Sequence, residues 1–267
     1  MKLAISQLAI KDFPFPQSLE LLRAFPLQGI EIAPKLLWED PGASSQEERL
    51  IAQQLFIDHG LKIVGLQSLL YGCPDLQVFG FAEQRQKCLE HLKAMMKLCR
   101  DMEGSLLIFG APKNRKRGDL PAQEAQDIAL DFFKEIGRAA EETGVIFCLE
   151  PVAAHYGCDF INTVKEAADL VRKVNLPHFR LQADTGSMFL NSEPFREVFR
   201  EYGDMIEHVH INDPDFSPPG AKGCDHKNVA SVLKEIGYDR WLSLEFMCRS
   251  TLREDLQYAL HCYAHEE

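Results

Sequence analysis

The stretch GVIFCLEPVAAHYGCDFINTVKEAADLVRKVNLPHFRLQAD, residues 144–184, contains a complete strand–helix–strand pattern. Two short apolar segments, 144–150 and 178–184, have the length of buried strands, and each ends in a carboxylate. Between them, residues 163–174 form an amphipathic stretch of helical length. This order of elements predicts two parallel strands joined by a helix.

The same alternation runs through the whole chain. Strands are expected at 2–8, 28–33, 61–67, 105–110, 144–150, 178–184, 205–212 and 240–246. Helices are expected at 16–25, 45–60, 82–101, 121–144, 163–174, 193–203, 228–237 and 250–263. Because no linker or low-complexity tract interrupts the pattern, we predict one α/β domain over residues 1–267, a (β/α)8 TIM barrel. A doubly wound open sheet is the alternative, but no GxGxxG turn follows the first strand.

The composition of the chain limits the kinds of partner and cellular environment that we expect. The net charge of −11 disfavours nucleic acid, because binding a phosphate backbone needs clustered Lys and Arg. No window of 18 apolar residues predicts a membrane span, and the first residues lack the features of a signal peptide. The eight cysteines form no CxxC pair. We therefore expect a cytoplasmic protein with reduced cysteines.

The functional site of a TIM barrel forms at the C-terminal ends of its strands. Polar groups occur there in most of the predicted strands or directly after them: Gln7, Glu31, Gln67, Lys113, Arg115, Glu150, Asp184, His210 and Glu245. Side chains alternate across a strand, so Glu150 shares a face with Ile146 and Cys148 and points into the barrel if Phe147 and Leu149 face the helices.

Three carboxylates that converge in a barrel mouth would repel one another, and a divalent cation would resolve the conflict. Glu150, Asp184, His210 and Glu245 are therefore candidate ligands for Mn²⁺, Mg²⁺ or Co²⁺, and Zn²⁺ also fits. Each residue alone has a simpler interpretation. A glutamate at a strand end can form a salt bridge, Asp184 can cap the following turn, and His210 can be a core histidine. Four such residues on four successive strands favour the metal site.

Several segments resemble the xylose-isomerase-like barrel superfamily, which comprises sugar and sugar-phosphate isomerases and epimerases and also endonuclease IV. The segments that carry the resemblance are GIEIAP, GVIFCLEP, LQADTGSM, HVHIND and PPGAKGCDHKNVASVLKEIGYDRWLSLE. The resemblance implies that Glu150, Asp184, His210 and Glu245 bind one divalent metal. It also implies that Glu150 and Glu245 are an acid–base pair, which moves a proton next to a carbonyl through an enediolate.

Two positions depart from the ketohexose 3-epimerases of that superfamily. Those enzymes place a histidine three residues after the metal-binding aspartate, where this chain has Ser187. They also place a substrate-binding arginine six residues after the metal-binding histidine, where this chain has Phe216. These departures predict that the metal chemistry is kept and that the substrate differs.

Other polar residues near the mouth are candidates for binding the substrate: Gln7, Glu31, Gln67, Lys113, Arg115, Ser187, His208 and Asp225. Lys113 and Arg115 could bind a phosphate or carboxylate, or could belong to a solvated basic loop. His208 lies deeper in its strand than His210 and is the better candidate for a structural role. Asp225 could instead cap the helix that starts near Asn228, and His226 could be a simple loop residue.

The leading functional hypothesis is a metal-dependent isomerase or epimerase of a small sugar or sugar phosphate. A dehydratase of the inosose or dehydroshikimate type is an alternative on the same scaffold. An endonuclease-IV-like repair enzyme and a non-catalytic metal-binding barrel are two further alternatives. The resemblance also implies a homodimer or homotetramer.

Overall fold

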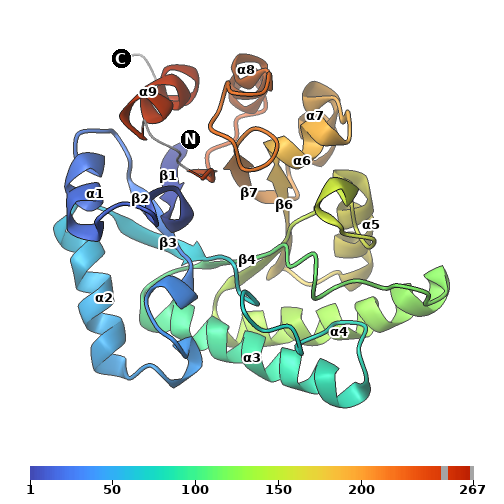
Figure 1. Cartoon of the computed structure of the whole chain (residues 1–267). Helices are drawn as coiled ribbons and strands as arrows, with labels where there is room; N and C mark the ends of the chain where they lie inside the picture. The colour runs from blue at the N-terminus through green and yellow to red at the C-terminus, as the bar shows by residue number, and fades with distance from the viewer. Residues whose placement is uncertain (248–251, 265–267) are drawn as a thin grey trace.

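The computed structural model describes residues 1–247 and 252–264 of the chain. Within them, eight parallel strands close into a barrel in chain order, which confirms the predicted TIM barrel (Figure 1). The strands are β1 Lys2–Ser6, β2 Gly29–Ile32, β3 Lys62–Leu66, β4 Leu106–Phe109, β5 Ile146–Leu149, β6 Phe179–Asp184, β7 Ile206–Ile211 and β8 Trp241–Leu244.

The helices follow the strands in alternation, and the long ones lie outside the barrel (Figure 1). They are α1 Phe15–Leu22, α2 Gln46–Asp58, α3 Ala82–Asp101, α4 Ala122–Thr143, α5 Val164–Val174, α6 Thr185–Leu190, α7 Phe195–Tyr202, α8 His226–Glu235 and α9 Leu252–Tyr263. The last predicted helix began at residue 250, and residues 250 and 251 lie outside the described part of the chain.

One helix was not predicted. The Thr-Gly-Ser sequence after Asp184 predicts a turn, but the chain forms the short helix α6 there. Asp184 is its N-cap, and one carboxylate oxygen, Oδ1, accepts a hydrogen bond from the Ser187 backbone N–H at 2.7 Å. The capping role considered for Asp184 is therefore real, and it leaves the second oxygen, Oδ2, outside the cap.

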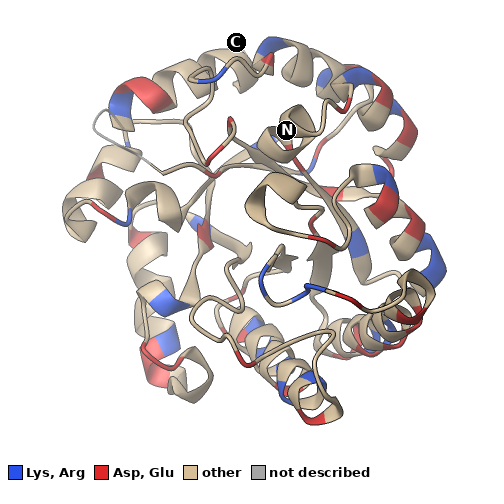
Figure 2. Cartoon of the chain, turned by 45° about the vertical axis from the view of Figure 1, so that its right-hand side comes forward, with Lys and Arg blue, Asp and Glu red and all other residues tan. Residues whose placement is uncertain are grey.

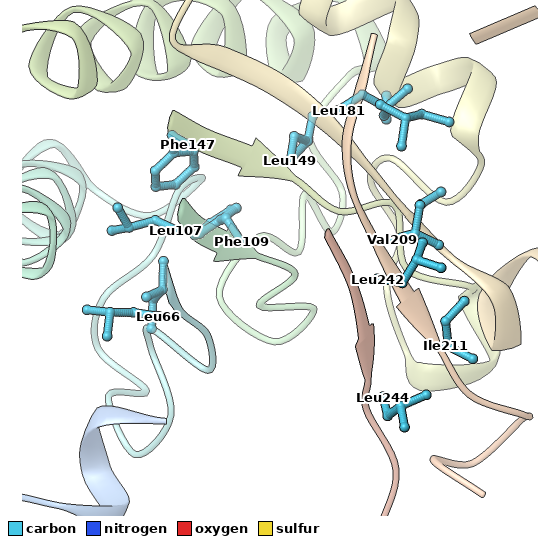
Figure 3. Close-up of a cluster of buried hydrophobic side chains, with 14 of the residues drawn as sticks. Leu66, Leu107, Phe109, Phe147, Leu149, Leu181, Val209, Ile211, Leu242 and Leu244 are labelled. Carbon is cyan, nitrogen blue, oxygen red and sulfur yellow. The ribbon is translucent and has the colours of Figure 1, made fainter. Parts of the chain in front are cut away.

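The two faces of the strands form two separate cores. The outward faces pack under the helices and supply the large cluster in Figure 3, where side chains from β3 to β8 lie together. Phe147 and Leu149 belong to this cluster, as the alternation in β5 predicted. The inward faces form a smaller cluster, whose buried members are Ala4, Val64, Leu106, Ile108 and Cys148. The barrel interior is therefore apolar below and polar at the mouth.

Strand register sets the level of the polar side chains. Asp184 of β6 is paired with His210 of β7, and His210 is paired with Ser243 of β8. Glu150 and Glu245 each follow directly on the last residues of β5 and β8. Parallel strands end at one edge of the sheet, so these side chains meet at the same end of the barrel.

Charged residues are distributed over the outer surface. Figure 2 shows Lys and Arg interspersed with Asp and Glu along the surrounding helices. Among the described residues, we find no helix with the length and apolar character that a membrane crossing requires.

Candidate metal centre and active site

Four side chains converge at the mouth of the barrel, and we call them the mouth cluster: Glu150, Asp184, His210 and Glu245. Each offers one ligand atom, and these atoms all lie within 4.8 Å of one another. Asp184, His210 and Glu245 are buried, and Glu150 is partly exposed. This is the set that the sequence proposed as metal ligands.

Each imidazole nitrogen of His210 has a distinct environment. Nδ1 lies 3.2 Å from Glu150 Oε1 and 3.0 Å from Glu245 Oε2. Nε2 lies 2.9 Å from Glu31 Oε2, on the inner side of the ring. A carboxylate on one nitrogen of a histidine fixes the proton there and leaves the other nitrogen free to bind a metal. The arrangement therefore presents Nδ1 to the three carboxylates of the cluster.

The carboxylates of the mouth cluster carry more negative charge than the protein compensates. Burial raises the pKa of Glu245 to about 7, and the charges of Glu150 and Asp184 contribute to the rise, although His210 opposes it. Burial likewise raises the pKa of Asp184 to about 6, with Glu150 adding to the shift. A divalent cation fits this donor set of three carboxylates and one imidazole, because it would remove the repulsion.

His210 is the cationic group nearest these carboxylates. Burial lowers its pKa, but the charges of Glu245 and Glu31 outweigh burial and hold the pKa well above its ordinary value. A metal that binds Nδ1 requires that nitrogen to be unprotonated.

A second layer of polar groups lies below the mouth cluster. Glu31 is fully buried and pairs with the imidazoles of both His208 and His210. Burial raises the pKa of Glu31, but the two histidines more than offset this and hold it below its ordinary value. His208 is also fully buried, as its deeper place in β7 predicted. Glu31 and His208 thus lie where they orient His210.

The other predicted substrate-binding residues have different surroundings. Gln7 Oε1 accepts a hydrogen bond from the Ala33 backbone N–H at 3.1 Å, and Gln67 Nε2 donates to Ser6 Oγ at 2.5 Å. Ser187 Oγ accepts from the Ala153 backbone N–H at 3.4 Å, beside the Asp184 cap. All three side chains are buried at the mouth end of their strands or directly after them.

The basic loop after β4 is not uniformly solvated. Lys113 is exposed, whereas Arg115 is fully buried and donates from Nη2 to the Ile161 backbone carbonyl at 3.3 Å. Its Nε and Nη1 have no hydrogen-bond partner among the described residues. Lys113 is therefore the accessible cation of the predicted pair.

Asp225 and His226 begin helix α8. Asp225 is the N-cap and accepts a hydrogen bond from the Asn228 backbone N–H at 3.0 Å. These contacts are the ones expected of a helix cap. His226 is wrongly described as a simple loop residue, because it is the first residue of α8 and is 1 % exposed. Its Nε2 lies 2.6 Å from Asp213 Oδ1, and its Nδ1 lies 2.7 Å from the Tyr263 hydroxyl.

Two further groups have ligand atoms within 4.8 Å of one another. Glu31, His208 and His210 form one, and Asp213, Cys224 and His226 form the other, which we call the clasp cluster. Here the carboxylate is already satisfied. Besides His226, Asp213 accepts hydrogen bonds from the backbone N–H groups of Gly220 at 3.1 Å and Lys222 at 2.5 Å. A metal would have to displace these bonds. We therefore interpret the clasp cluster as a structural group that joins the two ends of the loop between β7 and α8.

Two supporting residues were missed from the sequence. Asn212 Nδ2 donates to Asp184 Oδ2 at 2.7 Å, and Asn212 Oδ1 accepts from the Gly186 backbone N–H at 2.9 Å. A Cβ at Gly186 would lie 2.3 Å from that oxygen, so glycine permits the contact. Gln182 Nε2 donates to Glu150 Oε1 at 3.1 Å. The two-residue period of β6 and β7 was the available signal, because Gln182 and Asn212 share a face with Asp184 and His210.

Comparison with known families agrees with the fold. Residues 19–263 match the model of the xylose isomerase-like TIM barrel family. The chain belongs to this family. A curated relative is D-psicose 3-epimerase of Enterocloster bolteae, which is 26% identical over 125 residues. The match covers 47% of this chain and 39% of that enzyme, so the chain spans about two fifths of the relative's length.

Two solved structures of related fold are similar over nearly the whole barrel. The apo form of 3-keto-D-glucoside 4-epimerase from E. coli superposes with a TM-score of 0.81 at 19% identity, and the match covers 98% of this chain and all of that one. The IOLI protein, solved with a bound zinc atom, superposes with a TM-score of 0.78 at 21% identity, covering 99% of this chain and all of that one. This xylose isomerase-like barrel therefore shares its fold with both.

Proposed function

We propose that this protein is a divalent-metal-dependent isomerase or epimerase of a small sugar or sugar phosphate, with Glu150 and Glu245 as its acid–base pair. The observation that carries the proposal is the mouth cluster, where three carboxylates converge on the Nδ1 side of a single imidazole, His210. The names of the relatives, two of which are sugar epimerases, support the same class of reaction.

The cation would be held by oxygens of Glu150, Asp184 and Glu245 and by Nδ1 of His210. A bound divalent cation supplies Lewis acidity toward the carbonyl and hydroxyl oxygens of the substrate. The donor set suits Mn²⁺, Mg²⁺ or Co²⁺, and the zinc atom of the IOLI protein supports Zn²⁺ as a further candidate. The Asn212 and Glu31 contacts keep Asp184 and His210 in place for this role.

The acid–base step is assigned to the chain's own carboxylates. One of Glu150 and Glu245 removes the proton from the carbon next to the substrate carbonyl, and the other returns a proton to the resulting enediolate. A general base works best when its pKa lies near the working pH, and burial brings Glu245 into that range. Gln182 fixes the orientation of Glu150 through its bond to Oε1.

The substrate contacts are proposed at the rim. Gln7, Gln67 and Ser187 offer polar groups beside the mouth cluster, and Lys113 offers an exposed cation for a phosphate or carboxylate. Glu31 and His208 are assigned supporting roles because Glu31 pairs with the imidazoles of His208 and His210, and Asp225 because it caps α8. Arg115 belongs to the buried base of its loop.

The test is metal-dependent exchange of C–H hydrogen. Protein stripped of metal and reloaded with Mn²⁺, Mg²⁺, Co²⁺ or Zn²⁺ is incubated in D₂O with ketoses, ring ketones and sugar phosphates. Deuterium is expected next to the carbonyl of at least one compound, only in the loaded protein. Analysis of the products separates an epimer or isomer from a dehydrated compound. Absence of exchange from every compound with every metal would overturn the proposal.

A further inference from the structure

Two aromatic side chains from different loops meet at the rim of the mouth, and we call them the aromatic wall: Tyr156 and Phe216. Their ring centroids lie 5.6 Å apart with an interplanar angle of 41°. Tyr156 comes from the loop after β5, and Phe216 comes from the loop after β7. Phe216 is 39 % exposed, although it belongs to a loop that is otherwise tightly hydrogen-bonded.

Several contacts join the two loops around Asp215. The Asp215 backbone N–H donates to the Tyr156 hydroxyl at 2.8 Å, and its carboxylate lies 2.7 Å from His155 Nε2. The same carboxylate forms an ion pair with Lys222. The Phe216 carbonyl accepts a hydrogen bond from the Met247 backbone N–H at 2.8 Å, two residues after Glu245. The wall is therefore fixed to the strand ends that carry the mouth cluster.

The backbone holds Phe216 outward at an energetic cost. Asp215 and Phe216 have φ values of +58° and +52°, in the left-handed region that non-glycine residues rarely adopt. The surrounding contacts maintain this conformation in both residues. Packing alone does not explain this arrangement, because the ring that it positions stays partly in solvent.

The wall borders the carboxylates of the site. Burial raises the pKa of Tyr156 to about 12, and the charges of Asp184, Asp215 and Glu245 add to this rise. Phe216 is joined through its carbonyl to Met247, two residues after Glu245, so the wall lies beside the end of β8. A ligand at the mouth cluster would thus meet aromatic carbon on this side.

We infer that the aromatic wall is a specificity subsite that stacks on the C–H face of a six-membered ring, so that the preferred substrate is a cyclic polyol with its ketone inside the ring. This inference rests on the proposed function. Aromatic faces bind flat apolar surfaces, which a ring polyol offers and an extended open-chain ketose lacks. A hemiacetal ring hides its carbonyl, whereas a ring ketone keeps an acidic C–H beside a free carbonyl while it stacks.

The inference is tested by binding, separately from turnover. The probes are myo-inositol and D-glucitol, which each have six carbons and six hydroxyls and differ in ring closure. Calorimetric titration of the Mg²⁺-loaded protein is expected to show at least about fivefold tighter binding of myo-inositol. The variant Phe216→Ala should lose this preference, and Phe216→Trp should retain it.

The control variant is Phe81→Ala, which removes an exposed phenylalanine that is outside the wall. It should leave both affinities unchanged. Equal binding of the two probes, no binding of either, or a preference that survives Phe216→Ala would overturn the inference. Exchange in D₂O with 2-keto-myo-inositol and D-fructose then tests the reaction. A ring preference without exchange on any compound would contradict the proposed function and leave the subsite standing.

Discussion

The mouth cluster and the clasp cluster are both groups of largely buried potential metal ligands at the same end of the barrel, but their carboxylates differ in hydrogen bonding and in pKa. In the clasp cluster, Asp213 receives two backbone N–H bonds and an imidazole contact. Burial raises the pKa of Asp213, but these bonds outweigh it and lower the pKa overall. In the mouth cluster, burial and mutual repulsion raise the pKa of Asp184 and of Glu245.

The difference shows that closeness of ligand atoms does not by itself identify a metal site. Both clusters satisfy the same distance criterion. Only in the mouth cluster would a cation remove an energetic penalty rather than break existing hydrogen bonds. A cluster that needs a cation and one that is already satisfied should therefore respond differently to substitution and to metal.

The largest effect is expected from neutralising the acid–base carboxylates. Glu150→Gln and Glu245→Gln should each lower metal-dependent C–H exchange by about 10³-fold or more, because each removes a proton carrier and a metal ligand. The measurement is the rate of deuterium incorporation by NMR. Asp213→Asn is the matched control at the clasp cluster and should retain exchange within about threefold at a temperature where it is folded. Full activity in both glutamine variants would contradict the assigned mechanism.

The next effect is on stability, and here the larger change is expected from the clasp cluster. Asp213→Asn should lower the free energy of unfolding by about 3 kcal/mol, because an amide cannot accept all the bonds that the carboxylate accepts. In a barrel of this size, that change lowers Tm by roughly 6 to 12 °C. Calorimetry with and without Mg²⁺ measures it. The metal-induced rise in Tm should be the same as in the unsubstituted protein, and loss of that rise would place a metal at the clasp cluster.

The residues of the mouth cluster could be predicted from the sequence for a simple reason. Strand alternation and parallel topology determine which side chains point into a barrel and at which end. This rule predicts the positions of the four residues of the mouth cluster and the deeper position of His208. Gln182 and Asn212 obey the same rule, but uncharged amides give a weaker signal than carboxylates.

The clasp cluster and the aromatic wall could not be predicted in the same way. His226 meets Tyr263 across 37 positions of sequence, and Tyr156 meets the Asp215 backbone across 59. These contacts depend on the paths of loops, which no periodicity encodes. The helix α6 was missed because a Thr-Gly-Ser sequence is typical of a turn, and the cap by Asp184 overrides that local preference.

The smallest effect expected is a dependence of stability on pH that a metal cancels. The folded pKa values of Asp184, about 6, and Glu245, about 7, lie above their ordinary values of 3.8 and 4.5. The folded metal-free protein therefore holds these protons more tightly than the unfolded chain, and its stability falls as pH rises from about 4 through 7. His210, whose pKa is also raised, contributes stability below about pH 6.5 that is lost at higher pH, so it acts in the same direction.

A divalent cation should offset this loss, because it binds the ionised carboxylates and stabilises only the folded state. At about 100 times its Kd, it contributes about 2.7 kcal/mol, or roughly 5 to 10 °C in Tm. Thermal unfolding with Mn²⁺ and with EDTA should show this difference at pH 8 and little of it at pH 5. Glu245→Gln should flatten the dependence in the metal-free protein, whereas Asp213→Asn should preserve it. A metal effect that is equal at both pH values, or larger at pH 5, would mean that the mouth carboxylates are not the groups that the cation neutralises.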